Sequence, residues 1–232
     1  MSKELVQIRN FRDYAQCPEY SKYNWNVPSV AVKLPAQVVI ESCYRDIAVL
    51  NKRVDWSTIR SRVQAEVMKQ STKTAQQIYG NSVELLTSLR AWYLEQYRDG
   101  IEEAVFNLKL STEMGKTKIE ADIFCLLVSE TEVTLIDFVT GLSPEEILKD
   151  IGLRIKIYLL GKQNIKVNKI LAIRPDEKSA RYWTLTVNNS DNWNYKTEQV
   201  LQLMLASMNN NIFYPSPTGM CSTCKYKGIC SW

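Results

Sequence analysis

The cysteines at the two ends of this chain limit its possible folds more than any other sequence feature does. Residues 221–230 read CSTCKYKGIC and carry three of the six cysteines, Cys221, Cys224 and Cys230. Cys17 lies in an aromatic stretch near the N-terminus, FRDYAQCPEYSKY. Four thiolates suit either zinc or an iron–sulfur cluster, and spacing alone does not choose between them. We expect one centre that joins both ends and closes a loop of roughly 200 residues, which constrains the unfolded chain strongly.

The other two cysteines, Cys43 and Cys125, stand in apolar, strand-like contexts. Thiols in such places usually behave as small buried hydrophobes. We therefore leave them out of the expected metal centre.

Composition and charge indicate a soluble cytoplasmic protein. Hydrophobic residues make up 45% of the 232 residues. The formal net charge of +4 weakly favours acidic binding partners. The sequence has no long uncharged apolar run of the kind that forms a membrane helix. Its first residues are charged and do not resemble a signal peptide. Cytosolic thiols stay reduced, so a metal centre is favoured over disulfides. The chain has no histidine, the commonest general base near neutral pH.

The hydrophobic patterns predict one mixed α/β domain over residues 1–232, with a helical part (1–100), an α/β core (101–209) and a cysteine-rich tail (210–232). One helix of the core has a clear cap, because Ser143 precedes Pro144 and stands three residues before Glu146. The predicted helices are 11–23 (broken at Cys17-Pro18), 56–79, 82–99, 143–160 and 195–209, and the predicted strands are 104–110, 118–128, 132–138, 167–173 and 182–187.

One N-terminal cysteine followed by CxxCx5C at the C-terminal end resembles the PD-(D/E)XK superfamily, in particular its RecB/AddB-type iron–sulfur nucleases and the exonucleases of CRISPR adaptation. FRDYAQCPEYSKY, KIEADIFCLL, TLIDFVTG and RIKIY resemble further motifs of that family, in the same order. The resemblance implies a restriction-endonuclease-like mixed sheet flanked by helices, with an N-terminal helical layer. It also implies a [4Fe-4S] cluster, with zinc as the alternative, on Cys17, Cys221, Cys224 and Cys230.

The same resemblance implies a divalent-metal site. Asp122 and Asp137 match the family's acidic residues and would hold Mg²⁺ or Mn²⁺, while Tyr158 matches the tyrosine of its helix motif. Carboxylates suit these hard cations, and a bound cation can lower the pKa of its water and polarise a phosphate. On adjacent strands the two aspartates could face one point.

Three departures from the family pattern point to a degenerate site. The motif lysine is Val139, the motif glutamine is Arg154, and the metal-binding histidine has no counterpart. We expect Arg154 to be the replacement cation, because Lys156 should point away from the face shared by Arg154 and Tyr158. An arginine is a poor proton acceptor, and losing a charge stabiliser typically costs about 10²–10³ in rate. We therefore expect little or no cleavage. The alternative to a remnant metal site is that Asp122 and Asp137 are satisfied strand-end carboxylates, or that Asp137 forms a structural ion pair with Arg154.

Basic and aromatic residues add a weak signal for nucleic acid, because cations follow phosphates and aromatic rings stack on bases. We expect a protein that binds DNA, single-stranded or at ends, in replication, recombination or repair. Two alternatives stay open: an active Mg/Mn-dependent exonuclease using Arg154, and a non-catalytic protein-interaction subunit of a larger complex. The residues behind the signal are Arg53, Arg60, Arg62, Lys69, Lys73, Lys162, Lys166 and Lys169, with Trp25, Trp56, Trp92 and Trp193.

Overall fold

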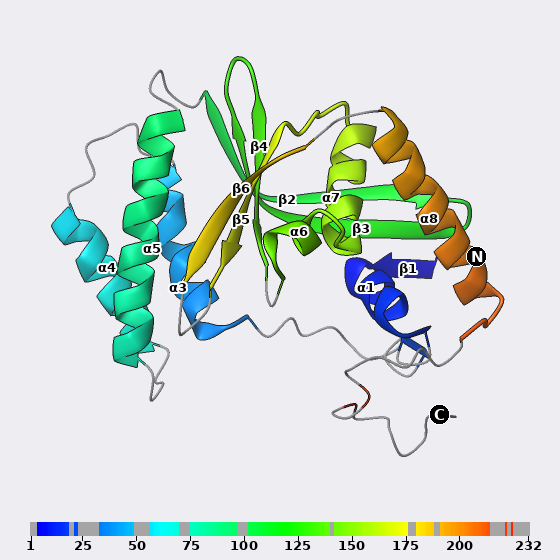
Figure 1. The fold of residues 1–232 in the computed structure, drawn as a ribbon, viewed down its shortest axis with the longest axis horizontal. Coiled ribbons are helices and arrows are strands. Elements are labelled where there is room, and N and C mark those ends of the chain that lie inside the picture. The colour runs from blue at the N-terminus through cyan, green and yellow to red at the C-terminus, as the bar shows by residue number, and fades with distance from the viewer. Residues whose placement is uncertain are drawn as a thin grey trace.

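The structure is a computed structural model, and it describes residues 4–18, 21–22, 33–48, 56–69, 75–96, 102–139, 142–175, 180–187, 191–213, 221 and 224. Helices flank a mixed sheet on both sides (Figure 1). The strands are β1 (Glu4–Gln7), β2 (Glu103–Met114), β3 (Thr117–Val128), β4 (Val133–Phe138), β5 (Lys169–Arg174) and β6 (Arg181–Thr186). The helices are α1 (Ile8–Gln16), α3 (Pro35–Ala48), α4 (Trp56–Lys69), α5 (Ala75–Gln96), α6 (Pro144–Ile147), α7 (Ile151–Lys162) and α8 (Asp191–Asn209).

The sheet forks at β3. One edge of β3 pairs with β2 along its whole length. On the other edge, parallel β1 pairs with residues 117–120 and antiparallel β4 pairs with residues 125–128. Among the described residues, no strand pairs with 121–124 on that edge. The C-terminal ends of β1 and β4 therefore run towards each other, and the chain leaves both strands at the fork.

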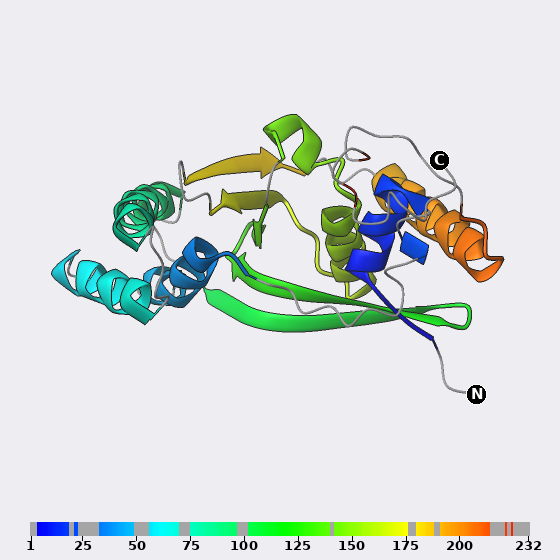
Figure 2. The same cartoon turned by 90° about the horizontal axis from the view of Figure 1, so that it is seen from below.

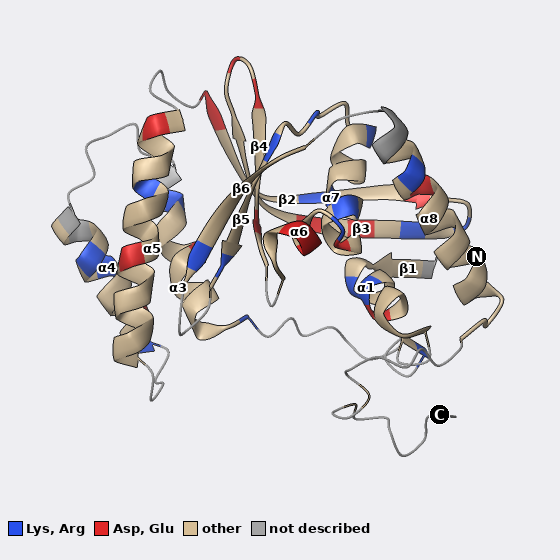
Figure 3. Ribbon diagram, in the orientation of Figure 1, with Lys and Arg blue, Asp and Glu red and all other residues tan. Residues whose placement is uncertain are grey.

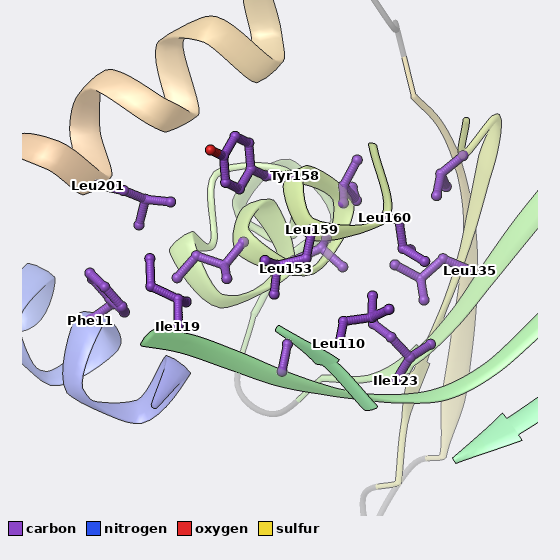
Figure 4. Close-up of a cluster of buried hydrophobic side chains, with 14 of the residues drawn as sticks. Phe11, Leu110, Ile119, Ile123, Leu135, Leu153, Tyr158, Leu159, Leu160 and Leu201 are labelled. Carbon is purple, nitrogen blue, oxygen red and sulfur yellow. The ribbon is translucent and has the colours of Figure 1, made fainter. Parts of the chain in front are cut away.

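Two hydrophobic cores lie on opposite faces of the sheet. The first packs α1, α7 and α8 against the sheet, and the second packs α3, α4 and α5 against the other face (Figures 1 and 2). Strands β4 and β5 contribute to both, because Leu135 and Ile170 belong to the first core whereas Ile136 and Leu171 belong to the second. Strands buried on both faces explain the continuous apolar runs of β4 and β5. Figure 4 shows the first core between the long hairpin and α7.

The predicted cap at Ser143 is confirmed, but the helix that it starts is short. The Ser143 N–H donates to Glu146 Oε2 at 2.8 Å. Hydrogen bonds from both the backbone and the side chain of Ser143 hold the pKa of the Glu146 carboxyl below its ordinary value. The chain then turns through 148–150, and Asp150 begins α7. The single helix expected over 143–160 is therefore two helices, because Asp150 acts as a second cap.

Two elements were missed by the sequence analysis. Strand β1 has only four residues, too few for an alternation pattern, and it depends on pairing with β3. Helix α3 contains Val38, Val39 and Ile40, β-branched residues that weaken the helical signal. Cys43 lies on this helix and not in a strand-like segment, although it is buried as expected. No helix of the described residues is long and apolar enough to cross a membrane.

The β2–β3 hairpin changes its buried face at Asn107. Before this point Phe106 packs against the second core, and after it Leu108 packs against the first. Strand β3 switches at the same level, with Ile123 in the first core and Cys125 in the second. Asn107 has φ of 55°, a left-handed conformation that asparagine tolerates better than most residues. This local bend lets one hairpin serve both cores.

We predict that Asn107→Val destabilises the protein by about 1–2 kcal/mol, because a β-branched residue is strained in the left-handed region. Asn107→Gly should be close to neutral, since glycine adopts this conformation readily. Ser111→Val, also exposed on β2 but without a positive φ, is the matched control and should cost little. Urea unfolding of the three variants measures this, and equal stabilities for the two valine variants would contradict it.

Candidate functional site

A buried ion pair joins β4 to α7 beside the fork. Lys156 Nζ donates to Asp137 Oδ1 at 2.6 Å. Both side chains are well covered, with exposed fractions of 14% for Lys156 and 7% for Asp137. Asp137 stands near the end of β4 opposite Ala172 of β5, on the face that α7 covers. At such depth a lone carboxylate is costly, so the ammonium is the group that keeps Asp137 in place.

A second ion pair lies at the start of α7, six residues before Lys156. Arg12 of α1 donates to Asp150 through Nε, at 3.1 Å to Oδ2, and through Nη2, at 2.5 Å to Oδ1. Asp150 also caps α7, because its carboxylate accepts from the Leu153 N–H at 2.8 Å. One carboxylate thus anchors α1 and begins the helix that carries Lys156.

Gly152 makes this crossing possible. A Cβ atom at residue 152 would lie 2.3 Å from Arg12 Nε, closer than any real contact. Gly152 and Lys156 are four residues apart, so they share one face of α7. The guanidinium therefore crosses α7 on the same face that directs Lys156 at Asp137.

The two ion pairs form one electrostatic unit, which we call the four-charge cluster: Arg12, Asp150, Lys156 and Asp137. Burial lowers the pKa of Arg12, but its hydrogen bond with Asp150 and the attraction of Asp150 and Asp137 leave that pKa above its ordinary value. Asp137 Oδ2 is buried and has no hydrogen-bond partner among the described residues. Two cations and two carboxylates balance, so the cluster carries no net charge.

Asp122 does not join this cluster. It lies between Ala121 and Ile123, which both contact the first core, so strand alternation turns it to the other face. Its cross-strand partner is Lys109, and both side chains are exposed. The expected convergence of Asp122 and Asp137 is therefore not found. The bend at Asn107 and the side switch of β3 are features that sequence reasoning had no signal for.

Arg154 and Tyr158 also lie away from Asp137. Two residues correspond to about 200° around an α-helix, so Arg154 is on the side of α7 opposite Lys156. Tyr158 is buried with its hydroxyl directed towards α8 (Figure 4). Burial raises the pKa of Tyr158, and Lys162 lies 5.1 Å from its ring centroid. Tyr158 therefore belongs to the contact between α7 and α8.

The cation that contacts Asp137 in the structure is Lys156, whereas the sequence analysis expected Arg154. Sequence reasoning set Lys156 aside because it faces away from Arg154 and Tyr158, and the alternative pair of Asp137 with Arg154 is replaced by Asp137 with Lys156. On α7, Gly152 lies against Arg12 of α1 and Lys156 contacts Asp137 of β4.

Val139 takes the position of the motif lysine and is part of the first core, with 5% of its surface exposed. Its N–H donates to the Ile173 carbonyl at 2.9 Å, which continues the pairing of β4 with β5. The position therefore contributes packing and no charge. Lys156 reaches the same carboxylate from the helix instead of the strand.

The described residues do not form a divalent-metal site. No group of three or more cysteine, aspartate or glutamate side chains within the described ranges could hold a metal ion. Asp137 is engaged by an ammonium, and Asp122 faces elsewhere. A hard cation needs several oxygen ligands and tolerates no adjacent positive charge well. The expected Mg²⁺ or Mn²⁺ site of Asp122 and Asp137 does not fit this arrangement.

The proposed cysteine centre is only partly within the described residues. Cys17 ends α1, where its N–H donates to the Asp13 carbonyl at 2.9 Å. The Cys224 N–H donates to the Cys221 carbonyl at 3.4 Å. Cys230 falls outside the described residues, so the four-cysteine set stays a prediction. Cys43 and Cys125 are buried in the second core, as expected, and burial raises the pKa of the Cys125 thiol.

The residues expected to bind nucleic acid are dispersed. Trp92 is buried in the second core, while Lys162 and Lys169 pair with Glu198 and Glu132. Arg60 and Arg62 are exposed on α4, far along the molecule from α7 (Figure 3). Lys69 pairs with Glu66, and Lys166 is exposed. The side chains of Trp56 and Trp193 are not described, and Arg53, Lys73 and Trp25 lie outside the described residues.

A pair of arginines not noticed in the sequence lies closer to the four-charge cluster. Arg174, the last residue of β5, and Arg181, the first residue of β6, are directly opposite each other in the register. Arg174 is two residues beyond Ala172, the partner of Asp137, so alternation places it on the same face as Asp137. We call this pair the sheet-end arginines.

Comparisons with known proteins identify the fold and not the family. A scan against protein-family models found no match, and neither did a search of the curated proteins. Among solved structures, the chain matches a crystal structure from Eubacterium rectale described as a "putative exonuclease", with 13% identity and a TM-score of 0.57. The match covers 100% of this chain and 91% of that chain. A second match, to SSO0001, has 14% identity, a TM-score of 0.39, and covers 83% of this chain and 94% of that one.

The first of these likenesses supports the expected fold class, a nuclease-like mixed sheet flanked by helices. At such low identity it shows a shared fold alone. The iron–sulfur subtype stays a prediction.

We predict that Lys156→Met destabilises the protein by about 3–5 kcal/mol, because it leaves the Asp137 carboxylate buried without its counter-ion. The double variant Asp137→Leu/Lys156→Met should recover most of that loss, since apolar pairs often replace buried ion pairs at little cost. Lys118→Met is the control, because Lys118 pairs with Glu120 at the surface and such pairs contribute less than about 1 kcal/mol. Urea unfolding measures all three, and similar losses for the two single variants would count against a buried pair.

Proposed function

We propose that this chain is a DNA-binding protein on a nuclease-like fold, with cleavage lost or strongly impaired. We further propose single-stranded DNA or DNA ends as the ligand and replication, recombination or repair as the setting. The ion pair of Lys156 with Asp137 carries the proposal. It occupies the carboxylate that a nuclease of this fold would use for its metal.

The loss of cleavage follows from charge and placement. Metal-dependent phosphodiester cleavage needs carboxylates that converge on a cation, which then activates water and stabilises the phosphate. Asp137 here neutralises an ammonium, and Asp122 stands on the exposed face of the hairpin. The described residues of this region provide neither a set of metal ligands nor a general base.

Retention of DNA binding is supported by the fold and by the sheet-end arginines. The fold is shared with the Eubacterium rectale protein whose description names an exonuclease, and exonucleases hold nucleic-acid ends. Arg174 and Arg181 lie at the end of the sheet, and Arg174 is on the face that carries Asp137. Guanidinium groups bind phosphates with two parallel hydrogen bonds, so an adjacent pair suits a phosphate backbone.

A second candidate function is metal-dependent cleavage in which Lys156 supplies the cation. The observation in its favour is the same 2.6 Å distance, since a lysine beside a carboxylate is the arrangement that the strand motif normally provides. In this case Asp137 would change partner from Lys156 to a metal when substrate binds. This candidate differs from the first in its requirement for Mg²⁺ or Mn²⁺.

We also propose that Cys17, Cys221, Cys224 and Cys230 hold a [4Fe-4S] cluster or a zinc ion. The cysteine spacing supports it. When bound, such a centre would fasten the tail to the end of α1. The four-charge cluster holds α1 against α7 through Arg12.

We expect the protein to bind a fluorescent single-stranded oligonucleotide, with an affinity that falls as salt rises because counterions are released. Arg174→Ala/Arg181→Ala should weaken binding and reduce the salt slope by about 1–2, because each arginine would neutralise one phosphate. Arg60→Ala/Arg62→Ala on α4 removes the same charge elsewhere and should change binding less. Fluorescence anisotropy from 50 to 200 mM salt, roughly the range over which such interactions weaken, is the measurement.

The outcomes separate the candidates. No binding at low salt would favour the protein-interaction alternative and contradict the proposal. Cleavage with Mg²⁺ or Mn²⁺ that disappears in Asp137→Asn would establish the second candidate instead. Binding without cleavage supports the first.

For the cysteine centre, we expect protein purified without oxygen to be brown, with iron and sulfide present. Cys221→Ser should lose the metal, because a thiolate ligand is removed. Cys43→Ser, at a buried cysteine outside the proposed set, should keep it. Zinc instead of iron would correct the cofactor, and metal retention in Cys221→Ser would contradict the ligand assignment.

A further inference from the structure

The geometry points to Lys156 as a built-in replacement for the divalent cation: its ammonium group occupies the cation position at Asp137 and excludes Mg²⁺ and Mn²⁺. This inference deepens the proposed function and rests on its non-cleaving form. It assigns the loss of metal binding to one side chain of α7. Neither the fold nor the motif departures at Val139 and Arg154 assign this role.

Distance and charge carry the first step. Lys156 Nζ lies 2.6 Å from Asp137 Oδ1, about half an ångström farther than the roughly 2.0–2.1 Å at which Mg²⁺ contacts its oxygen ligands. Two cations cannot share that position. Inside a protein, repulsion between charges a few ångströms apart is much stronger than in water. A divalent ion could reach Asp137 Oδ1 only if the ammonium moved away.

The surroundings oppose such movement. Only 14% of the Lys156 side chain is exposed, and the chain comes from the middle of α7, between buried Ile155 and Ile157. Arg12 adds a second positive charge, which attracts Asp137 across the four-charge cluster. Asp150, the other carboxylate, is engaged by Arg12. The described charges facing Asp137 therefore disfavour a divalent cation.

The surroundings of Asp137 indicate what would follow if the Lys156 ammonium were removed. The residue is buried, with an exposed fraction of 5%, and Oδ2 has no hydrogen-bond partner among the described residues. Both carboxylate oxygens would then be available to one ion. Lys156→Gln keeps a similar length and hydrogen-bonding ability but removes the charge. It should therefore restore cation binding that the natural chain lacks.

The experiment measures Mn²⁺ binding by water-proton relaxation, in the absence of DNA and with the cysteine centre intact. Wild type and Asp137→Asn should bind Mn²⁺ equally weakly, because Asp137 takes no metal. Lys156→Gln should bind at least about tenfold more tightly, as expected for removing a unit charge next to the site. The double variant Asp137→Asn/Lys156→Gln should return to the wild-type level.

Two results would overturn the inference. One is Mn²⁺ binding by wild type that Asp137→Asn abolishes, and this comparison needs no change at Lys156. The other is a folded Lys156→Gln protein, checked by circular dichroism, that binds no better than wild type. Lys118→Gln, at a surface lysine, controls for the general loss of positive charge. DNA binding is not measured, so failure here leaves the DNA-binding proposal to be tested separately.

Discussion

The buried pair of Lys156 and Asp137 is the interaction on which this account depends. It lies where β4 ends, where the sheet forks and where α7 covers the first core. A buried carboxylate must be neutralised, by a proton, a metal or another side chain. In this chain a lysine does so from a helix. The same contact therefore holds α7 on the sheet and decides what Asp137 can do chemically.

The arrangement of the residues around this ion pair depends on which strands and helices meet at the fork in the sheet. Strand β1 and strand β4 approach each other along β3 and leave residues 121–124 without a strand partner on that edge, within the described part of the chain. Helix α1 leaves β1 at this point, and Arg12 crosses α7 over Gly152 to reach Asp150. Asp150 in turn begins the helix that presents Lys156. Gly152 leaves room for the Arg12 guanidinium, and the Asp150 cap begins the helix that carries Lys156.

Much of the fold could be predicted from the sequence, and the site could not. Long apolar patterns predicted the positions of α5, β3, β4, β5 and α8, and Ser143 with Glu146 predicted the start of α6. Short β1 and valine-rich α3 lack such patterns and are stabilised by their neighbours. At the site, motif resemblance singled out Asp137 and expected Arg154 as its cation, whereas the structure pairs Asp137 with Lys156. The orientation of α7 is set by packing at Gly152, and the position of Asp122 is set by the bend at Asn107. Both are three-dimensional effects that residue spacing does not encode.

A crystal structure of the protein grown with Mn²⁺, with data collected at the manganese absorption edge, tests the central claim most directly. The account predicts Lys156 Nζ within hydrogen-bonding distance of Asp137 and no anomalous peak at that carboxylate. A manganese peak bound to Asp137, with Lys156 turned away, would contradict it.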